Sequence, residues 1–133
     1  MKTFTTSTFL RTVLFADAAA TGATGLLMTL AAPLLAKVLH LPVGLLLVAG
    51  LVLLPYAALV AYLATRERLQ PSAIWTLIVC NVLWGVDCAV VAFSGWIAPT
   101  ALGYAFILMQ VVVVFAFAEL QYVGLRRSAA AAA

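Results

Sequence analysis

Four uninterrupted apolar stretches occupy most of this chain and leave little room for anything else. They cover residues 12–32, 42–64, 72–93 and 99–121. Each has about 20 residues or more, and at ~1.5 Å of helical rise per residue this length crosses the ~30 Å hydrocarbon core of a bilayer. Of the 133 residues 67% are hydrophobic and 8% are charged, more apolar surface than a soluble domain of this size can bury. We therefore expect an integral membrane protein.

The apolar stretches should be α-helices, because lipid offers no hydrogen-bond partners to exposed backbone groups. The links between them are short, so the sequence predicts one membrane domain over residues 1–133. The expected fold is an all-α four-transmembrane-helix bundle with short loops. Pro33 should end the first span, and residues 33–40 are expected to form a short interfacial helix. Pro55 falls inside the second span and should kink it.

The basic residues predict how the bundle is oriented. Apart from Lys37, they lie before the first stretch, between the second and third, or after the fourth: Lys2, Arg11, Arg66, Arg68, Arg126 and Arg127. Because cytoplasmic loops carry an excess of Lys and Arg, both termini should be cytoplasmic. These charges flank spans and form no patch, so the net charge of +3 does not indicate nucleic-acid binding. The Ala-, Leu- and Val-rich spans suit a bacterial inner membrane, and we expect the first span to be retained, not cleaved as a signal peptide.

Small residues recur at helical spacing along several spans. In the first span, Ala18, Gly22 and Gly25 share one face, and Gly50 and Gly85 offer similar smooth positions in the second and third. Small residues let helix backbones approach closely, and close packing drives helix association in lipid. The pattern predicts helix-packing faces, and the face in the first span is also what the seam of a homo-oligomer would use.

Polar residues inside the spans are the best functional lead. Asp17 and Thr21 share a face of the first span, Asn81 and Gln110 lie near the expected midplane, and Asp87 lies in the outer half. An acid at helix centre costs about 2.5–3.5 kcal/mol on insertion scales, so some compensation is expected. One hypothesis is a substrate or proton site in which an acid exchanges a proton for a cation. The other is a structural carboxyl that hydrogen-bonds to Thr21, Asn81 or Gln110.

The membrane-embedded acid in the first of four helices resembles the small multidrug resistance transporters in architecture. Asp17 occupies a loosely similar place, and the resemblance implies proton-coupled transport of a cationic or hydrophobic substrate. That family carries Glu at the position, has little charge bias and assembles in opposed orientations. The charge bias of this chain favours a single orientation, so the likeness is one of architecture and not of membership.

Catalysis is not expected. The sequence holds no nucleophile–base pair, phosphate loop or metal-ligand cluster, and His40 is its only histidine. Cys80 and Cys88 are too far apart on one helix to bridge each other. We expect no cofactor and no metal. The leading hypothesis is a homo-oligomeric bundle or an accessory, structural subunit of a membrane complex. The alternative is a small proton-coupled transporter that uses Asp17 or Asp87.

Overall fold

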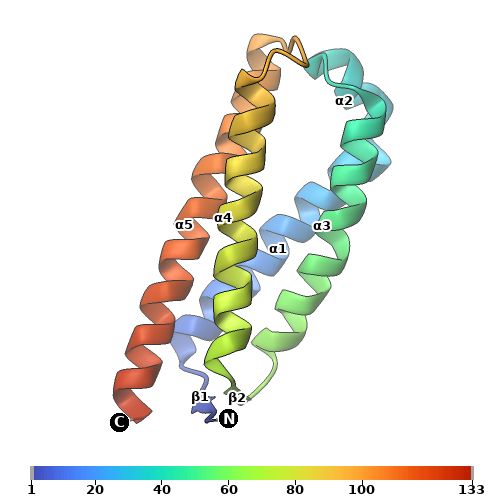
Figure 1. Ribbon diagram of the computed structural model, residues 1–133. Helices are drawn as coiled ribbons and strands as arrows, with labels where there is room; N and C mark the ends of the chain where they lie inside the picture. The colour runs from blue at the N-terminus through green and yellow to red at the C-terminus, as the bar shows by residue number, and fades with distance from the viewer. Residues whose placement is uncertain (1, 133) are drawn as a thin grey trace.

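The computed structural model describes residues 2–132, which form five helices (Figure 1). Four are long: α1 (Thr8–Leu30), α3 (Val43–Ala64), α4 (Pro71–Phe93) and α5 (Ala101–Ala132). The short helix α2 (Ala32–Leu39) joins α1 to α3. The four long helices are long and apolar enough to cross a membrane. Both chain termini lie at one end of the bundle, called the terminal end below, and α2 lies at the other, called the α2 end (Figure 1).

Local residue chemistry explains where the helices begin and end. Helix α1 starts about one turn before residue 12 because the Ser7 hydroxyl caps it, accepting a 3.1 Å hydrogen bond from the backbone N–H of Leu10. Pro33 lies in the first turn of α2, where backbone N–H groups have no partner within the helix, so its missing N–H costs no hydrogen bond. Helix α3 continues on both sides of Pro55, and the expected kink there stays a prediction. Helix α5 runs about three turns past residue 121.

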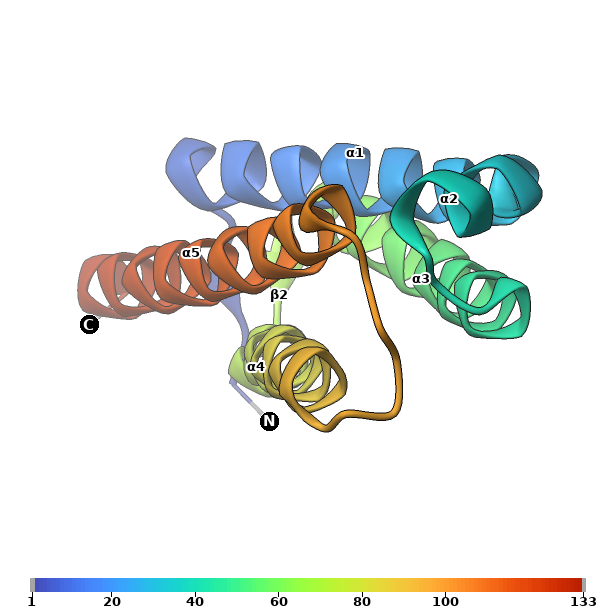
Figure 2. The same cartoon turned by 90° about the horizontal axis from the view of Figure 1, so that it is seen from above.

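The four long helices associate as two hairpins. Helix α1 packs along α3, and α4 packs along α5, where Gly85 lets the ring of Phe115 approach closely. Helices α1 and α5 join the hairpins to each other, whereas α3 and α4 make almost no contact. Seen from above, α1 and α3 cross beside each other, and α4 lies next to α5 (Figure 2). The two hairpins therefore leave a gap in the packing between α3 and α4.

The small residues of the first span are used inside the chain. A Cβ on Gly50 of α3 would lie 2.9 Å from the carbonyl oxygen of Gly25 on α1, so the two backbones touch at this crossing. Gly22 faces Ala57 of α3, and Ala18 packs against the buried core. Helix α3 of the same chain therefore packs on the small-residue face of α1, and an oligomer that uses this face stays a prediction.

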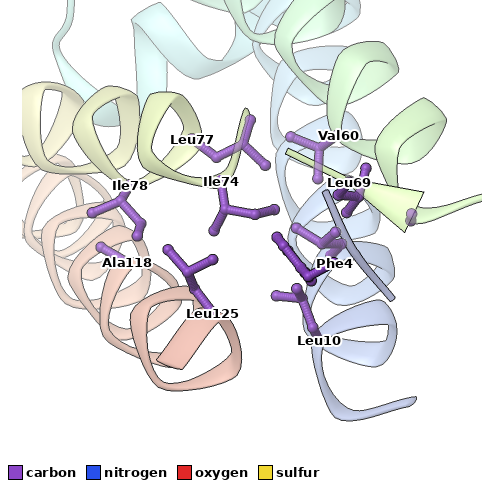
Figure 3. Packing of buried hydrophobic residues seen from close by; sticks show 11 residues of the cluster. Phe4, Leu10, Val60, Leu69, Ile74, Leu77, Ile78, Ala118 and Leu125 are labelled. Carbon is purple, nitrogen blue, oxygen red and sulfur yellow. The ribbon is translucent and has the colours of Figure 1, made fainter. Parts of the chain in front are cut away.

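The N-terminal residues form a strand that the sequence did not predict. Strand β1 (Phe4–Thr5) pairs antiparallel with β2 (Arg68–Leu69) in the loop between α3 and α4. The Phe4 side chain is 3% exposed and plugs the terminal end of the core, near Leu10 and Leu125 (Figure 3). The N-terminus thereby ties the start of one hairpin to the start of the other.

Candidate functional site

Asp17 lies at the centre of a buried polar cluster. Its side chain is 0% exposed, and four side chains donate hydrogen bonds to its carboxylate. The Thr21 hydroxyl donates to Oδ1 at 2.9 Å. Oδ2 accepts from the Tyr56 hydroxyl at 3.2 Å, from Asn81 Nδ2 at 3.3 Å and from Gln121 Nε2 at 2.6 Å. These five residues are called the Asp17 cluster below.

The Asp17 cluster draws on all four long helices. Thr21 and Tyr56 come from the α1–α3 hairpin, and Asn81 and Gln121 come from the α4–α5 hairpin. Asn81 Nδ2 also donates to Gln121 Oε1 at 3.1 Å, so the two amides orient each other. Among residues 2–132, two hydrogen bonds between side chains join the long helices of one hairpin to those of the other, and both end on Asp17. The Tyr56 hydroxyl also donates to the backbone oxygen of Leu77 on α4, at 3.5 Å. Asp17 is therefore the main polar link between the hairpins.

The chemistry of the Asp17 cluster is that of a carboxylate held by neutral donors. An ionised carboxylate only accepts hydrogen bonds, and each neighbour supplies an O–H or N–H. In the described part of the chain no Lys or Arg forms an ion pair with Asp17. Hydrogen bonds to a charged acceptor are stronger than those between neutral groups, and a buried polar group is costly without them. This geometry suits a group that fixes helix positions.

The structure brings together three of the five predicted polar residues. Asp17, Thr21 and Asn81 meet in the cluster. Gln110 lies outside it, where its Oε1 accepts a 3.0 Å hydrogen bond from the indole N–H of Trp84.

Two members of the cluster were not predicted. Tyr56 lies eight residues from the end of α3. At that depth in a membrane its hydroxyl needs a hydrogen-bond partner, so its position in the sequence indicates a polar contact inside the bundle. Hydrophobicity alone predicts that the fourth span ends at Gln121, but α5 continues to Ala132 and places this residue well inside the helix.

Asp87 lies apart from the Asp17 cluster, on the exposed face of α4. Within residues 2–132 no side chain donates a hydrogen bond to it. Two adjoining cavities of about 250 Å³ and 220 Å³ open beside it, between α3 and α4. Both are lined by Val52 of α3 and by Trp84 and Asp87 of α4. We call the two cavities together the α3–α4 groove.

The groove connects the surroundings of the two acids. Its larger cavity lies toward the α2 end and has mainly apolar walls, including Met28 and Phe106. The smaller cavity is walled by Thr21, Tyr56 and Asn81, three of the residues that donate to Asp17. The cluster thus forms part of the groove wall while its carboxylate stays buried.

Residues 2–132 contain no group of three or more His, Cys, Asp or Glu side chains that could hold a metal ion. Comparison with models of protein families, with curated proteins and with solved structures finds no match for the chain. The features of the chain that bear on its function are therefore the Asp17 cluster and the α3–α4 groove.

Proposed function

We propose that the chain is a multi-pass protein of the bacterial inner membrane with both termini in the cytoplasm. Four apolar helices of sufficient length support the membrane location. The distribution of basic residues supports the orientation, because Lys37 alone lies at the α2 end and the others lie at the terminal end. Arg66 and Arg126 there lie over the rings of Tyr62 and Tyr122, a combination suited to the membrane surface.

Within that membrane, we propose that the protein binds a small amphipathic molecule that enters the α3–α4 groove sideways from the lipid. The observation that carries this proposal is a carboxylate, Asp87, on the wall of an apolar groove between two helices that scarcely touch. Ligand pockets are commonly apolar concavities with a few polar groups that orient the ligand. In this proposal the groove walls hold the apolar body and Asp87 meets the polar group.

The Asp17 cluster has a structural role in this proposal. Its bonds to Asn81 and Gln121 hold the hairpins at a fixed separation, and that separation leaves the groove open. Asp17 itself is buried and already satisfied by four donors, so it offers a ligand no free face.

A subunit role is the second candidate, and one observation favours it. Thr76, Cys80 and Asp87 form an exposed polar stripe along α4. Polar groups on a membrane helix usually face another helix. A second copy or another membrane protein would then cover the α3–α4 groove, and the chain would act as a homo-oligomer or an accessory subunit.

Trp84 fluorescence tests the ligand proposal directly. In a Trp75→Phe/Trp96→Phe background Trp84 is the remaining tryptophan, and quenching of its fluorescence reports a brominated molecule in the groove. The protein is placed in lipid nanodiscs and titrated with three 4-bromododecyl probes, which carry a trimethylammonium, a hydroxyl or a carboxylate head close to the bromine. Saturable quenching by at least one probe is expected.

Two variants show whether the quenching comes from the groove. Val52→Phe fills the groove from an exposed position and should abolish saturation, whereas Leu51→Phe, exposed on the same helix outside the groove, should not. Absence of saturable quenching with all three probes would overturn the ligand proposal. A second protein chain in the mass of gently extracted complexes would then favour the subunit role.

A further inference from the structure

We infer that the molecule bound in the α3–α4 groove is an organic cation, held by the carboxylate of Asp87 beside the indole ring of Trp84. This inference rests on the proposed ligand-binding function and names the ligand's charge class. Both residues line both cavities of the groove. They are three positions apart on α4, so they lie on neighbouring parts of one helix face.

The ring of Trp84 is held in place by a hydrogen bond to Gln110, which also lines the larger cavity. Its N–H donates to Gln110 Oε1 at 3.0 Å, and Gln110 is buried on α5. The hydrogen-bonding edge of the indole is thereby occupied, and the ring is left to offer its π surface. A tryptophan face attracts cations more strongly than the other aromatic rings do. The groove thus combines a fixed aromatic surface with a carboxylate.

The charge of Asp87 has no balancing partner in the described part of the chain. The basic residues of residues 2–132 lie at the two ends of the bundle, and none forms an ion pair with Asp87. Helix α4 ends at Phe93, six residues later, so Asp87 lies about 9 Å from that end. A carboxylate at this depth is costly in lipid unless a positive group accompanies it.

A metal ion does not fit this site. Divalent cations need several oxygen, nitrogen or sulfur ligands, and residues 2–132 gather no group of three such acidic, His or Cys side chains. The walls of the larger cavity beside Asp87 are mainly apolar, with Val52 and Val91 among them. Such walls favour a weakly hydrated cation with apolar substituents, such as an alkylated ammonium, which loses little hydration on entering.

The three bromododecyl probes separate this inference from the function on which it rests. Titrated against Trp84 fluorescence in nanodiscs, the trimethylammonium probe should bind at least tenfold more tightly than the hydroxyl and carboxylate probes. Asp87→Asn should weaken its binding at least tenfold and leave the hydroxyl probe unaffected. Asp87→Glu should restore most of the affinity. Glu119→Gln is the control: it neutralises a different exposed acid, on α5 and outside the groove, and should leave the affinity for the trimethylammonium probe unchanged.

Each possible result of these titrations supports or overturns one of the two proposals. Equal saturable binding of the hydroxyl and ammonium probes, unchanged by Asp87→Asn, would overturn the cation inference and leave the ligand-binding function standing. No saturable binding of any probe would overturn both. An additional chain retained by the wild type and lost in Asp87→Asn, with no probe binding, would show that the cation belongs to a partner helix and would overturn the small-molecule assignment. Circular dichroism of Asp87→Asn checks that the variant is folded.

Discussion

Gln121 and Asp17 lie 104 residues apart in the chain, and a 2.6 Å hydrogen bond joins the amide of the first to the carboxylate of the second. The bond connects the last helix to the first and closes the four-helix arrangement. Asp87, the other acid considered from the sequence, takes no part in it. The two acids therefore have different surroundings, and we propose different roles for them: Asp17 stabilises the fold, and Asp87 meets the ligand.

Asp17→Asn should destabilise the protein by roughly 2–3 kcal/mol. The new amide group would place N–H donors among the amides of Asn81 and Gln121, which already donate, so buried donors would lose their acceptor. Reversible unfolding in mixed micelles measures the change in the free energy of unfolding. Asp87→Asn is the matched control and should leave that free energy nearly unchanged without ligand. Equal stability of the two variants would contradict the assignment.

Gly50→Ala should also destabilise the bundle, by about 1–3 kcal/mol. The added Cβ would lie 2.9 Å from the backbone oxygen of Gly25, which cannot move aside as a flexible side chain can. Gly44→Ala on the same helix is the control, because nothing lies within 4 Å of its added Cβ. Both variants gain the same methyl group, so a similar loss of stability in both would show that the α1–α3 crossing is not tightly packed.

Removal of the Phe4 side chain tests the pairing of strand β1 with β2, called the N-terminal strap below. Phe4→Ala should cost roughly 3 kcal/mol, since the ring is nearly fully buried among residues of both hairpins. It should also speed hydrogen exchange at the Thr6 amide, which donates a 2.8 Å bond to the carbonyl oxygen of Glu67. Thr5→Ala, an exposed change in the same strand, should leave the exchange rate nearly as it is. If the Thr6 amide of the wild type exchanges as fast as an unstructured amide, the strap does not form.

Reporter fusions test the orientation. Alkaline phosphatase, active only outside the cytoplasm, should be active when fused after Gly95, in the loop at the α2 end. The same enzyme fused after Arg127 should be inactive, because the basic residues should keep the terminal end in the cytoplasm. The reverse pattern would invert the proposed topology.

The sequence was sufficient to predict the helices but not how they pair. Length and hydrophobicity predict four long helices, and Pro33 locates the short α2, because these signals are local. Which small face meets which helix is a property of the assembled bundle. The sequence alone therefore does not show whether the Ala18–Gly25 face packs inside the chain or against another copy. In the structure α3 packs on it.

Helix pairing also decides which polar residues meet in the Asp17 cluster. Depth along each span suggested Gln110 as a neighbour of Asn81, but the packing of α4 on α5 brings Gln121 there instead and leaves Gln110 to Trp84. The strap at Phe4 was missed because a strand of two residues carries no periodic pattern.

Thermal unfolding with and without the trimethylammonium probe tests the central claim, the division of roles between the two acids, most directly. Ligand that binds only the folded state raises stability, by about 1.4 kcal/mol at tenfold excess over Kd. The wild type should show this rise in Tm. Asp17→Asn should strongly lower the Tm of the ligand-free protein, whereas Asp87→Asn should keep the ligand-free Tm of the wild type and lose the response to the probe. A full response in Asp87→Asn, or an unchanged Tm in Asp17→Asn, would contradict the account.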